Sequence, residues 1–410
     1  MRCPHCGRET PPGAYCGFCG ARLPQGEGGE VPPRHGGRMR AHAYAADPRE
    51  SLFTPAVIST LFPHLPPRRA TLARWVLLIG VLVALGVALG RYAPIAIVLG
   101  AVLLPILYLI YFVDVAVYED EPVIVLALTF IAGAVLGAAL SLGFYRVLIG
   151  QRGLSLSGGP SASYVVLNAV VLPLLGQLLM LVGPLALYFI RPRFNDILDG
   201  LVFGVASALG FAAAQSVVYA WQIISGPLQR GGGVFDWALP TLRVTLLTPL
   251  LYAGATGLIC AAIWLRRDPH VRQRPRTLAT ALPFALLAAA VGQVAPSLLT
   301  DLIPGETRSF IWYLLAAAGL LFLARVGLHV GLLEKGAEAE GIATMVRCPT
   351  CQRLTPDLAF CAECGMALRA SPKRGARRVA PPETPPAAGP ADAPPPVAPP
   401  ESAGPEGGAQ

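Results

Sequence analysis

The sequence predicts an all-α polytopic membrane protein, a bundle of about eight transmembrane helices flanked by two small four-cysteine zinc ribbons. Hydrophobic residues make up 54% of the 410-residue chain and charged residues only 14%, which is too apolar for an ordinary soluble domain. Apolar segments near the length of about 20 residues that crosses a bilayer recur through the middle of the chain. A pattern of four cysteines occurs near both ends with identical spacing.

The cysteine pattern predicts a zinc ribbon at residues 1–22 and a second one at residues 345–368. In each, two Cys-x2-Cys turns lie nine residues apart, and four thiolates can close a tetrahedron around Zn²⁺. The alternative is a disulfide framework, but paired turns of this kind without a signal peptide favour zinc. Four protein ligands leave no open position, so both sites are expected to be structural. The predicted ligands are Cys3, Cys6, Cys16, Cys19, Cys348, Cys351, Cys361 and Cys364.

Residues 23–70 are predicted to form a linker that contains a short amphipathic segment. Residues 21–50 are rich in Gly, Pro and Arg, and we expect no fixed structure there. Residues 51–66 can place apolar side chains on one helix face, so they either lie on the membrane surface or cap the bundle. His64 is expected to be an exposed loop residue. The tail at 369–410 is dense in Pro, Ala and Gly and is predicted to be disordered, with a solvated basic run.

Residues 71–334 are predicted to form the transmembrane bundle. An even number of spans places both termini on one side, and the arginine-rich loops on that side make it cytoplasmic by the positive-inside rule. The formal charge of +8 therefore reflects orientation in the cell membrane, and we expect the lipid bilayer, not nucleic acid, as its partner. No charged leader precedes an apolar core, so insertion relies on internal spans. The predicted spans are 72–90, 92–116, 122–149, 163–190, 198–224, 240–265, 277–300 and 310–333.

Acidic residues within or beside a span are candidate functional groups, because charge inside a bilayer is costly. The candidates are Asp114, near the end of the second span, and Asp196 and Asp199, at the start of the fifth. A carboxylate at a helix end meets water at little cost, so a capping role is the simpler interpretation. Cys260 lies in an apolar run and is expected to be a small buried hydrophobe, while Gly133, Gly137 and Gly204 suit close helix packing.

Several motifs make residues 72–333 similar to one family. They are Tyr118-Glu119-Asp120-Glu121-Pro122, Pro173, the stretch from Arg193 to Gly204 that contains Asp199-Gly200-Leu201-Val202-Phe203-Gly204, Gly210-Phe211 and Tyr219. This order resembles the PrsW family of intramembrane proteases, which is related to the CAAX-prenyl endopeptidases. The resemblance implies an active site of a Glu-Glu-x-x-Lys motif, a Phe-x-x-x-Glu motif and later histidines.

Carried onto this chain, the expected catalytic positions hold no acid, lysine or histidine. The Glu-Glu-x-x-Lys motif falls on Gly176, Gln177 and Met180, the second acid falls on Gln215, and a histidine position falls on Tyr252. Gln293 is the nearest polar residue to the last histidine position. A glutamine cannot accept a proton near neutral pH and is a poor ligand for a divalent ion. The family fold is therefore expected to persist without peptide-bond hydrolysis.

The polar residues left in the core allow two interpretations. Gln177, Gln215, Ser216, Tyr252 and Thr256 could line a pocket for a neutral ligand or a substrate helix, or they could form interhelical hydrogen bonds, which we favour. The leading hypothesis is a non-catalytic binding or scaffold protein with cytoplasmic zinc ribbons that bind a protein partner. One alternative is an active intramembrane metalloprotease with a site relocated to Asp114, Asp196 or Asp199. A transporter fits less well, because no broken-helix pair or charged pathway is visible.

Overall fold

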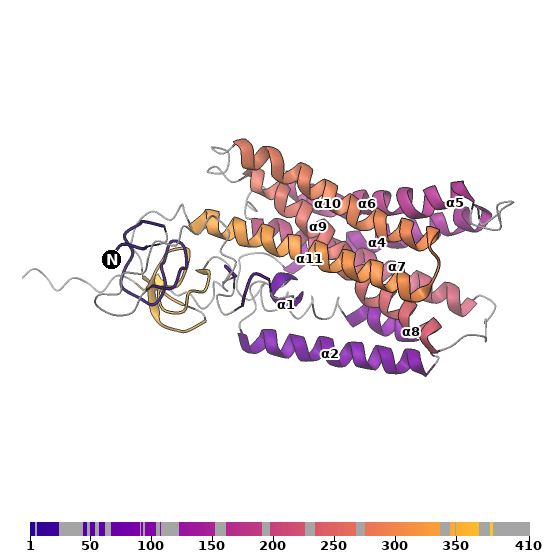
Figure 1. The fold of residues 1–410 in the computed structure, drawn as a ribbon, viewed down its shortest axis with the longest axis horizontal. Helices are drawn as coiled ribbons and strands as arrows, with labels where there is room; N and C mark the ends of the chain where they lie inside the picture. The colour runs from indigo at the N-terminus through magenta and orange to yellow at the C-terminus, as the bar shows by residue number, and fades with distance from the viewer. Residues whose placement is uncertain are drawn as a thin grey trace, which may run out of the picture.

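The computed structural model places the membrane helices in one bundle and the two cysteine-rich ends together beside it (Figure 1). It describes residues 1–4, 6–23, 44–46, 50–53, 57–61, 67–90, 92, 95–103, 107, 123–151, 161–190, 197–225, 234–267, 275–336, 345–348, 350–368 and 378–379. His64, Asp114 and Asp196 lie outside these residues, as does most of the predicted disordered tail.

Six described helical segments are long and apolar enough to cross a membrane, and they correspond to the last six predicted spans. They are Ile124–Phe144, Ala162–Ile190, Ile197–Trp221, Ala238–Trp264, Thr280–Leu302 and Glu306–Leu333. The chain is therefore an integral membrane protein. The first predicted span falls in α2 (Pro67–Leu89), whose apolar stretch is Arg74–Val87. The second is described only in part, with helix at 95–103, so the total of eight stays a prediction.

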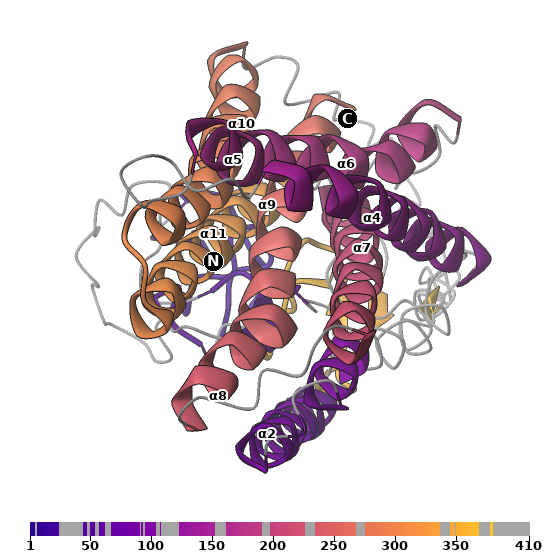
Figure 2. The ribbon, with the colours of Figure 1, turned by 90° about the vertical axis from the view of Figure 1, so that its right-hand side faces the viewer.

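The bundle consists of helices and short helical turns, which follow one another along the chain. They are α4 (Val123–Gln151), α5 (Ala162–Val166), the π-helical turn η1 (Leu167–Val171), α6 (Leu172–Ile190), α7 (Ile197–Ser225), α8 (Val234–Leu242), a second π-helical turn η2 (Arg243–Leu247), α9 (Thr248–Trp264), the 3₁₀ turn η3 (Leu265–Arg267), α10 (Pro275–Leu302) and α11 (Glu306–Gly336). Viewed along the bundle from the end opposite the ribbons, α7 and α9 lie side by side, with α4, α6, α10 and α11 around them (Figure 2).

The centre of the bundle is α7, whose residues from 200 to 212 are all buried. Small residues allow the backbones to approach closely on both of its sides. A Cβ added at Gly133 of α4 would overlap the backbone carbonyl of Ser207, and one at Gly204 would lie 2.8 Å from the carbonyl oxygen of Thr256 in α9. Cys260 is fully buried beside Gly204. The predicted packing roles of these glycines and of Cys260 are confirmed.

The segment predicted to be a linker is partly ordered against α11. Tyr44, Leu52 and Leu61 are fully buried, and the short helix α1 (Val57–Leu61) packs between α2 and α11. Of the two positions considered for residues 51–66, the described part caps the bundle. The expectation that residues 21–50 lack fixed structure is wrong at 21–23, where Leu23 packs in the core of the first ribbon. It is also wrong for Tyr44–Ala46 and for Glu50, because α11 offers them buried polar partners.

A buried arginine holds this segment. Arg325 of α11 is 2% exposed, stacks on the Tyr44 ring at 3.8 Å and donates to Glu50 at 3.0 Å and to Ser59 at 2.8 Å. His329, one turn along α11, accepts from the backbone N–H of Ala45 at 3.0 Å. A charge buried this deeply needs such partners, because desolvation would otherwise cost several kcal/mol. The segment is thereby tied to the last membrane helix.

The second ribbon contains a small antiparallel sheet in the order β2-β1-β3. Strand β1 (Met345–Arg347) pairs with β2 (Leu354–Pro356), with Val346 opposite Thr355. It also pairs with β3 (Arg378–Val379), which falls inside the segment 369–410 predicted to be disordered. The prediction is wrong at these two residues, because the free edge of β1 offers backbone hydrogen bonds to a returning chain.

Candidate functional site

Each cysteine quartet is assembled as a metal site. Within each group the four sulfurs lie within 4.8 Å of one another. In the first ribbon Sγ–Sγ distances are 3.7 Å for Cys3–Cys19 and 3.8 Å for Cys6–Cys16; in the second they are 3.7 Å for Cys348–Cys364 and 3.8 Å for Cys351–Cys361. A tetrahedral Zn²⁺ with bonds of about 2.3 Å spaces its sulfurs by about 3.8 Å. The donors therefore fit zinc without rearrangement.

The turns around the sulfurs are the same in both ribbons. The residue after the first Cys-x2-Cys pair has positive φ in each case, +73° at Gly7 and +61° at Gln352. Thr10 accepts from the N–H of Gly17 at 3.2 Å, and the corresponding Thr355 accepts from Ala362 at 3.1 Å. Burial raises the pKa of the Cys6 thiol to about 11, so a bound cation would be needed to hold a thiolate there at neutral pH.

The two ribbons pack against each other through reciprocal contacts. The N–H of Tyr15 donates to the carbonyl oxygen of Ala362, and the N–H of Phe360 donates to that of Gly17, both at 2.8 Å. The Phe360 ring covers Gly20 and the Tyr15 ring covers Gly365, each within 3 Å of an added Cβ. Because Tyr15 corresponds to Phe360 and Gly20 to Gly365 in the repeat, the pair is close to two-fold symmetric. The double-ribbon unit suggested by the equal spacing is therefore formed.

The two ribbons differ in the side chains that they place at their shared interface. Leu358, 2% exposed, inserts into the core of the first ribbon beside Cys3, Cys16 and Phe18. The corresponding position in the first ribbon is Gly13, whose added Cβ would lie 2.6 Å from the carbonyl oxygen of Ala362. A second copy of the C-terminal ribbon could not take the place of the first, because its leucine would meet that carbonyl. The interface thus favours one ribbon of each kind.

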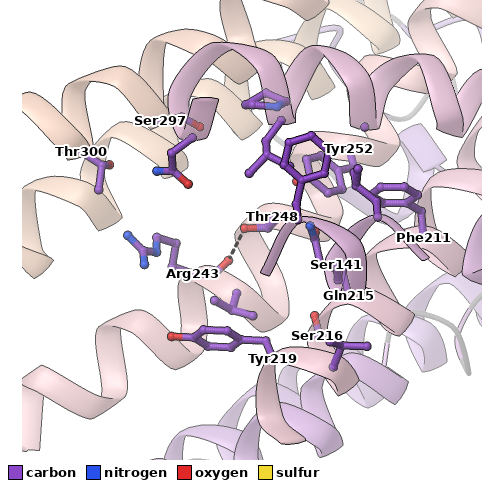
Figure 3. A pocket seen from close by; sticks show the side chains of 18 of the residues that line it. Ser141, Phe211, Gln215, Ser216, Tyr219, Arg243, Thr248, Tyr252, Ser297 and Thr300 are labelled. Atoms are coloured by element: carbon purple, nitrogen blue, oxygen red, sulfur yellow. Dashed lines mark hydrogen bonds between the residues drawn. The ribbon is translucent and has the colours of Figure 1, made fainter. Parts of the chain in front are cut away.

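A cavity of about 450 Å³ lies between the helices, and Figure 3 shows side chains that line it. Tyr164 of α5 is one of the lining residues, and α5 lies at the end of the bundle away from the ribbons (Figure 1). The inner part of the cavity is lined by Gly176 of α6, by Gln215 and Ser216 of α7 and by Tyr252 of α9, with Phe211 stacked edge-on against Tyr252 at 6.0 Å. Three of the positions expected from the family motif, Gly176, Gln215 and Tyr252, therefore share one cavity.

The outer part of the cavity carries charge that the sequence reasoning did not identify. Arg243, in η2, donates to Ser309 and lies over the Tyr313 ring at 5.5 Å. Asp301, in the last turn of α10, accepts from the Asn168 amide at 2.8 and 3.1 Å. All of these except Ser309 line the cavity. An arginine inside a predicted span is itself a signal of function, and Arg243 could have been found in this way.

Two π-helical turns place Asn168 and Arg243. In η1 the Leu172 N–H donates to Leu167, directly before Pro173, and in η2 the Thr248 N–H donates to Arg243, directly before Pro249. Each proline lacks the N–H that an α-helical turn would use, and the wider turn rotates the side chains that precede it. Such turns recur at functional sites, and here each one contributes a side chain to the cavity.

The remaining motif positions form a buried hydrogen-bonded cluster. Gln177 donates to Thr256 at 3.2 Å and accepts from Gln293, while Thr256 contacts the Met180 sulfur at 3.7 Å. Gln293, the polar residue nearest to the last expected histidine position, therefore lies beside Gln177. The preference for interhelical hydrogen bonds thus holds for Gln177 and Thr256. Gln215, Ser216 and Tyr252 line the cavity, and the Gln215 side chain also hydrogen-bonds Tyr252 of the neighbouring helix. The difference arises from which face of each helix these residues occupy.

Among the described residues, the two cysteine quartets are the only groups of three or more His, Cys, Asp or Glu side chains close enough to share a metal ion. Asp199, at the start of α7, does not line the cavity. The described part of the core therefore presents one carboxylate to the cavity, that of Asp301, without neighbouring imidazole or thiolate ligands.

A family model described as PrsW family intramembrane metalloprotease matches residues 121–295. The match begins just before α4 and ends within α10, so it contains the inner cavity positions but neither ribbon. The matched range is shorter than residues 72–333, the range over which the sequence motifs resemble this family. A comparison with curated proteins and one with solved structures each found no match.

Proposed function

We propose that this protein is a non-catalytic PrsW-like protease homologue that works as a membrane-anchored binding or scaffold protein through a pair of cytoplasmic zinc ribbons. The main support for a non-catalytic core is the identity of the residues that line the cavity. At three positions where the family motif calls for ionisable groups, the cavity presents Gly176, Gln215 and Tyr252. A glycine, an amide and a phenol supply neither a general base near neutral pH nor a strong ligand for a divalent ion.

In this proposal the two ribbons bind the protein partner. Their sulfur spacing fits two structural zinc ions, which would hold each ribbon rigid without an open coordination position. Because the faces around Tyr15, Gly17 and Phe360 are occupied by the other ribbon, a protein partner would bind the outer surface of the pair as one unit. Both termini would then be cytoplasmic, where thiolates stay reduced.

The rival is an active enzyme with a relocated site, and Asp301 is the specific observation in its favour. Its carboxylate lines the cavity, although Asn168 holds both oxygens. A lone carboxylate could activate water only weakly without a metal or a second acid. Cleavage of a membrane-spanning peptide that is lost in Asp301→Asn would favour the rival.

Metal analysis of the full-length protein tests the proposal. We expect two zinc ions per chain, matching the two quartets, and none when the quartet cysteines are all replaced by serine. Cys260→Ser is the matched control and should keep both ions, because Cys260 is buried in the bundle core and belongs to neither quartet. A stoichiometric divalent ion that remains in the quartet-free variant would overturn the non-catalytic assignment.

A further inference from the structure

The outer cavity holds two opposite charges, Arg243 and Asp301, that are each bound mainly by other side chains. Arg243 is engaged by Ser309 and Tyr313, and Asp301 is engaged by Asn168. Both line the cavity and are near enough for the charge of Arg243 to act on Asp301, but among the described residues no contact within 4 Å joins the two as an ion pair. Each keeps unused capacity, because a guanidinium has five donors and a carboxylate about four acceptor sites. A ligand that carries both an anion and a cation would satisfy the two together.

The mouth of the cavity lies at the level of a membrane interface. Asp301 is one residue from the end of the span Thr280–Leu302, and the next span begins at Glu306. Aromatic side chains gather at the same end of the bundle, including Trp221 at 67% and Tyr219 at 40% exposure. Tyrosine and tryptophan concentrate where acyl chains give way to head groups. The charged residues are therefore placed where lipid head groups lie.

The size of the cavity separates a head group from a membrane-spanning helix. One turn of an α-helix about 10 Å wide and 5.4 Å long occupies about 420 Å³. The cavity measures about 450 Å³, which is close to the volume of one such turn and well below that of a helix that spans the membrane. Apolar side chains such as Leu140, Phe144 and Leu172 line it beside the charged ones, which suits the glycerol and the first methylenes of an acyl chain.

We infer that this cavity binds the zwitterionic head group of a membrane lipid, with its phosphate at Arg243 and its primary ammonium at Asp301. A guanidinium matches phosphate geometry, and a primary ammonium offers three donors to the carboxylate. A quaternary choline has no N–H to donate, and a glycerol head group has no cation. Phosphatidylethanolamine meets both requirements, and it lacks the additional carboxylate of phosphatidylserine, which would lie beside Asp301. The inference rests on the proposed function in one respect, since the cavity binds a ligand without hydrolysing it.

Binding of short-chain lipids to the purified full-length protein tests this inference by native mass spectrometry. We expect dihexanoyl phosphatidylethanolamine to bind about tenfold more tightly than the phosphatidylcholine or phosphatidylglycerol analogue. Asp301→Asn should abolish the preference for ethanolamine over choline. Arg243→Gln should weaken binding of both by about tenfold, with partial recovery in Arg243→Lys, which keeps the charge and loses the planar fork.

Arg308→Gln is the matched control, because Arg308 is exposed in the first turn of α11 and does not line the cavity. Thermal unfolding of each variant verifies that it is folded. Equal binding of the three lipids, or an unchanged preference in Asp301→Asn, would overturn the inference. Free phosphoethanolamine that binds as tightly as the lipid would overturn the assignment to a lipid. None of these results alters the metal content, so failure here is distinguishable from failure of the proposed function.

Discussion

The ribbon pair and the cavity lie at opposite ends of the bundle and hold their polar groups in different ways. In each ribbon four sulfurs converge on one point from turns less than twenty residues apart along the chain. In the cavity, groups from α6, α7, η2, α9 and α10 face a shared space without converging on one atom. The ribbon sulfurs thus suit a single ion, whereas the spread of groups around the cavity is in keeping with the lipid head group that we propose for it.

This difference bears on the proposal that the cavity binds a ligand without cleaving a peptide bond. Packing of α7 against α4 and α9 depends on glycines and apolar side chains, whereas Gln215 lies at the cavity. Chemistry depends on the few side chains that reach the cavity. The fold and the reaction are therefore separable, and the polar groups that remain can serve binding.

Loss of one metal site should have the largest effect on the ribbon end. Cys361→Ser removes one ligand of the second quartet, and structural zinc contributes about 10–16 kcal/mol to small zinc domains. We expect the zinc content to fall from two ions to one. Because the ribbons pack reciprocally through Tyr15 and Phe360, hydrogen exchange at residues 13–20 should also rise. Unchanged exchange there would show that the two ribbons are independent.

Placing charged residues at the motif positions of the core should have the next largest effect, a loss of stability of the helix bundle. The combined replacement of Gly176→Glu, Gln177→Glu, Met180→Lys and Gln215→Glu places ionisable groups among buried helices. Gln177 and Met180 are at most 6% exposed, and uncompensated buried charge costs about 3–5 kcal/mol. We expect a clearly lowered thermal unfolding temperature and no proteolysis. A stable, proteolytic variant would contradict the interpretation of Tyr252 and Gln293 as lost ligands.

Separating the ribbons without touching a cysteine should have a smaller effect. In Gly13→Val the new side chain would meet the Ala362 carbonyl, and such overpacking costs about 1–3 kcal/mol. We expect two zinc ions to remain while hydrogen exchange rises in both ribbons. Gly7→Gln is the matched control, since Gly7 has nothing within 4 Å of an added Cβ and the corresponding position in the second ribbon is Gln352, also at positive φ.

The smallest expected effect concerns the segment that joins the two ends. Burial would raise the pKa of Glu50, but hydrogen bonds from Ser59 and Arg325 outweigh it and lower the pKa below its ordinary value of 4.5. A carboxyl with a lowered folded pKa stabilises the fold above its unfolded pKa and loses that contribution as the pH falls through the folded value. Protection factors for hydrogen exchange, which correct for the slower intrinsic exchange in acid, should therefore fall at residues 44–61 below about pH 4.5, and less so in Glu50→Gln.

The last six spans, the packing glycines and the cysteine quartets could be predicted because their signals are local in the sequence. Hydropathy over a window reports a span, and Cys-x2-Cys spacing reports a thiolate pair. The docking of Tyr44 and Glu50 onto Arg325 could not be predicted in this way, since Glu50 and Arg325 lie 275 residues apart. That Arg243 and Asp301 share one cavity could not be predicted either, because they lie on different helices.

The sequence by itself determined that this is a helical membrane protein with two cysteine quartets and a core whose motif positions carry Gly176, Gln177, Met180, Gln215 and Tyr252. Composition and spacing suffice for those conclusions, because each depends on residues near one another along the chain. Only the tertiary structure decided that the ribbons pair, that Gln177 is buried in a hydrogen-bonded cluster while Gln215 faces a cavity, and that Arg243 and Asp301 share its mouth. Helix rotation and long-range packing set those relationships, and no local pattern encodes them.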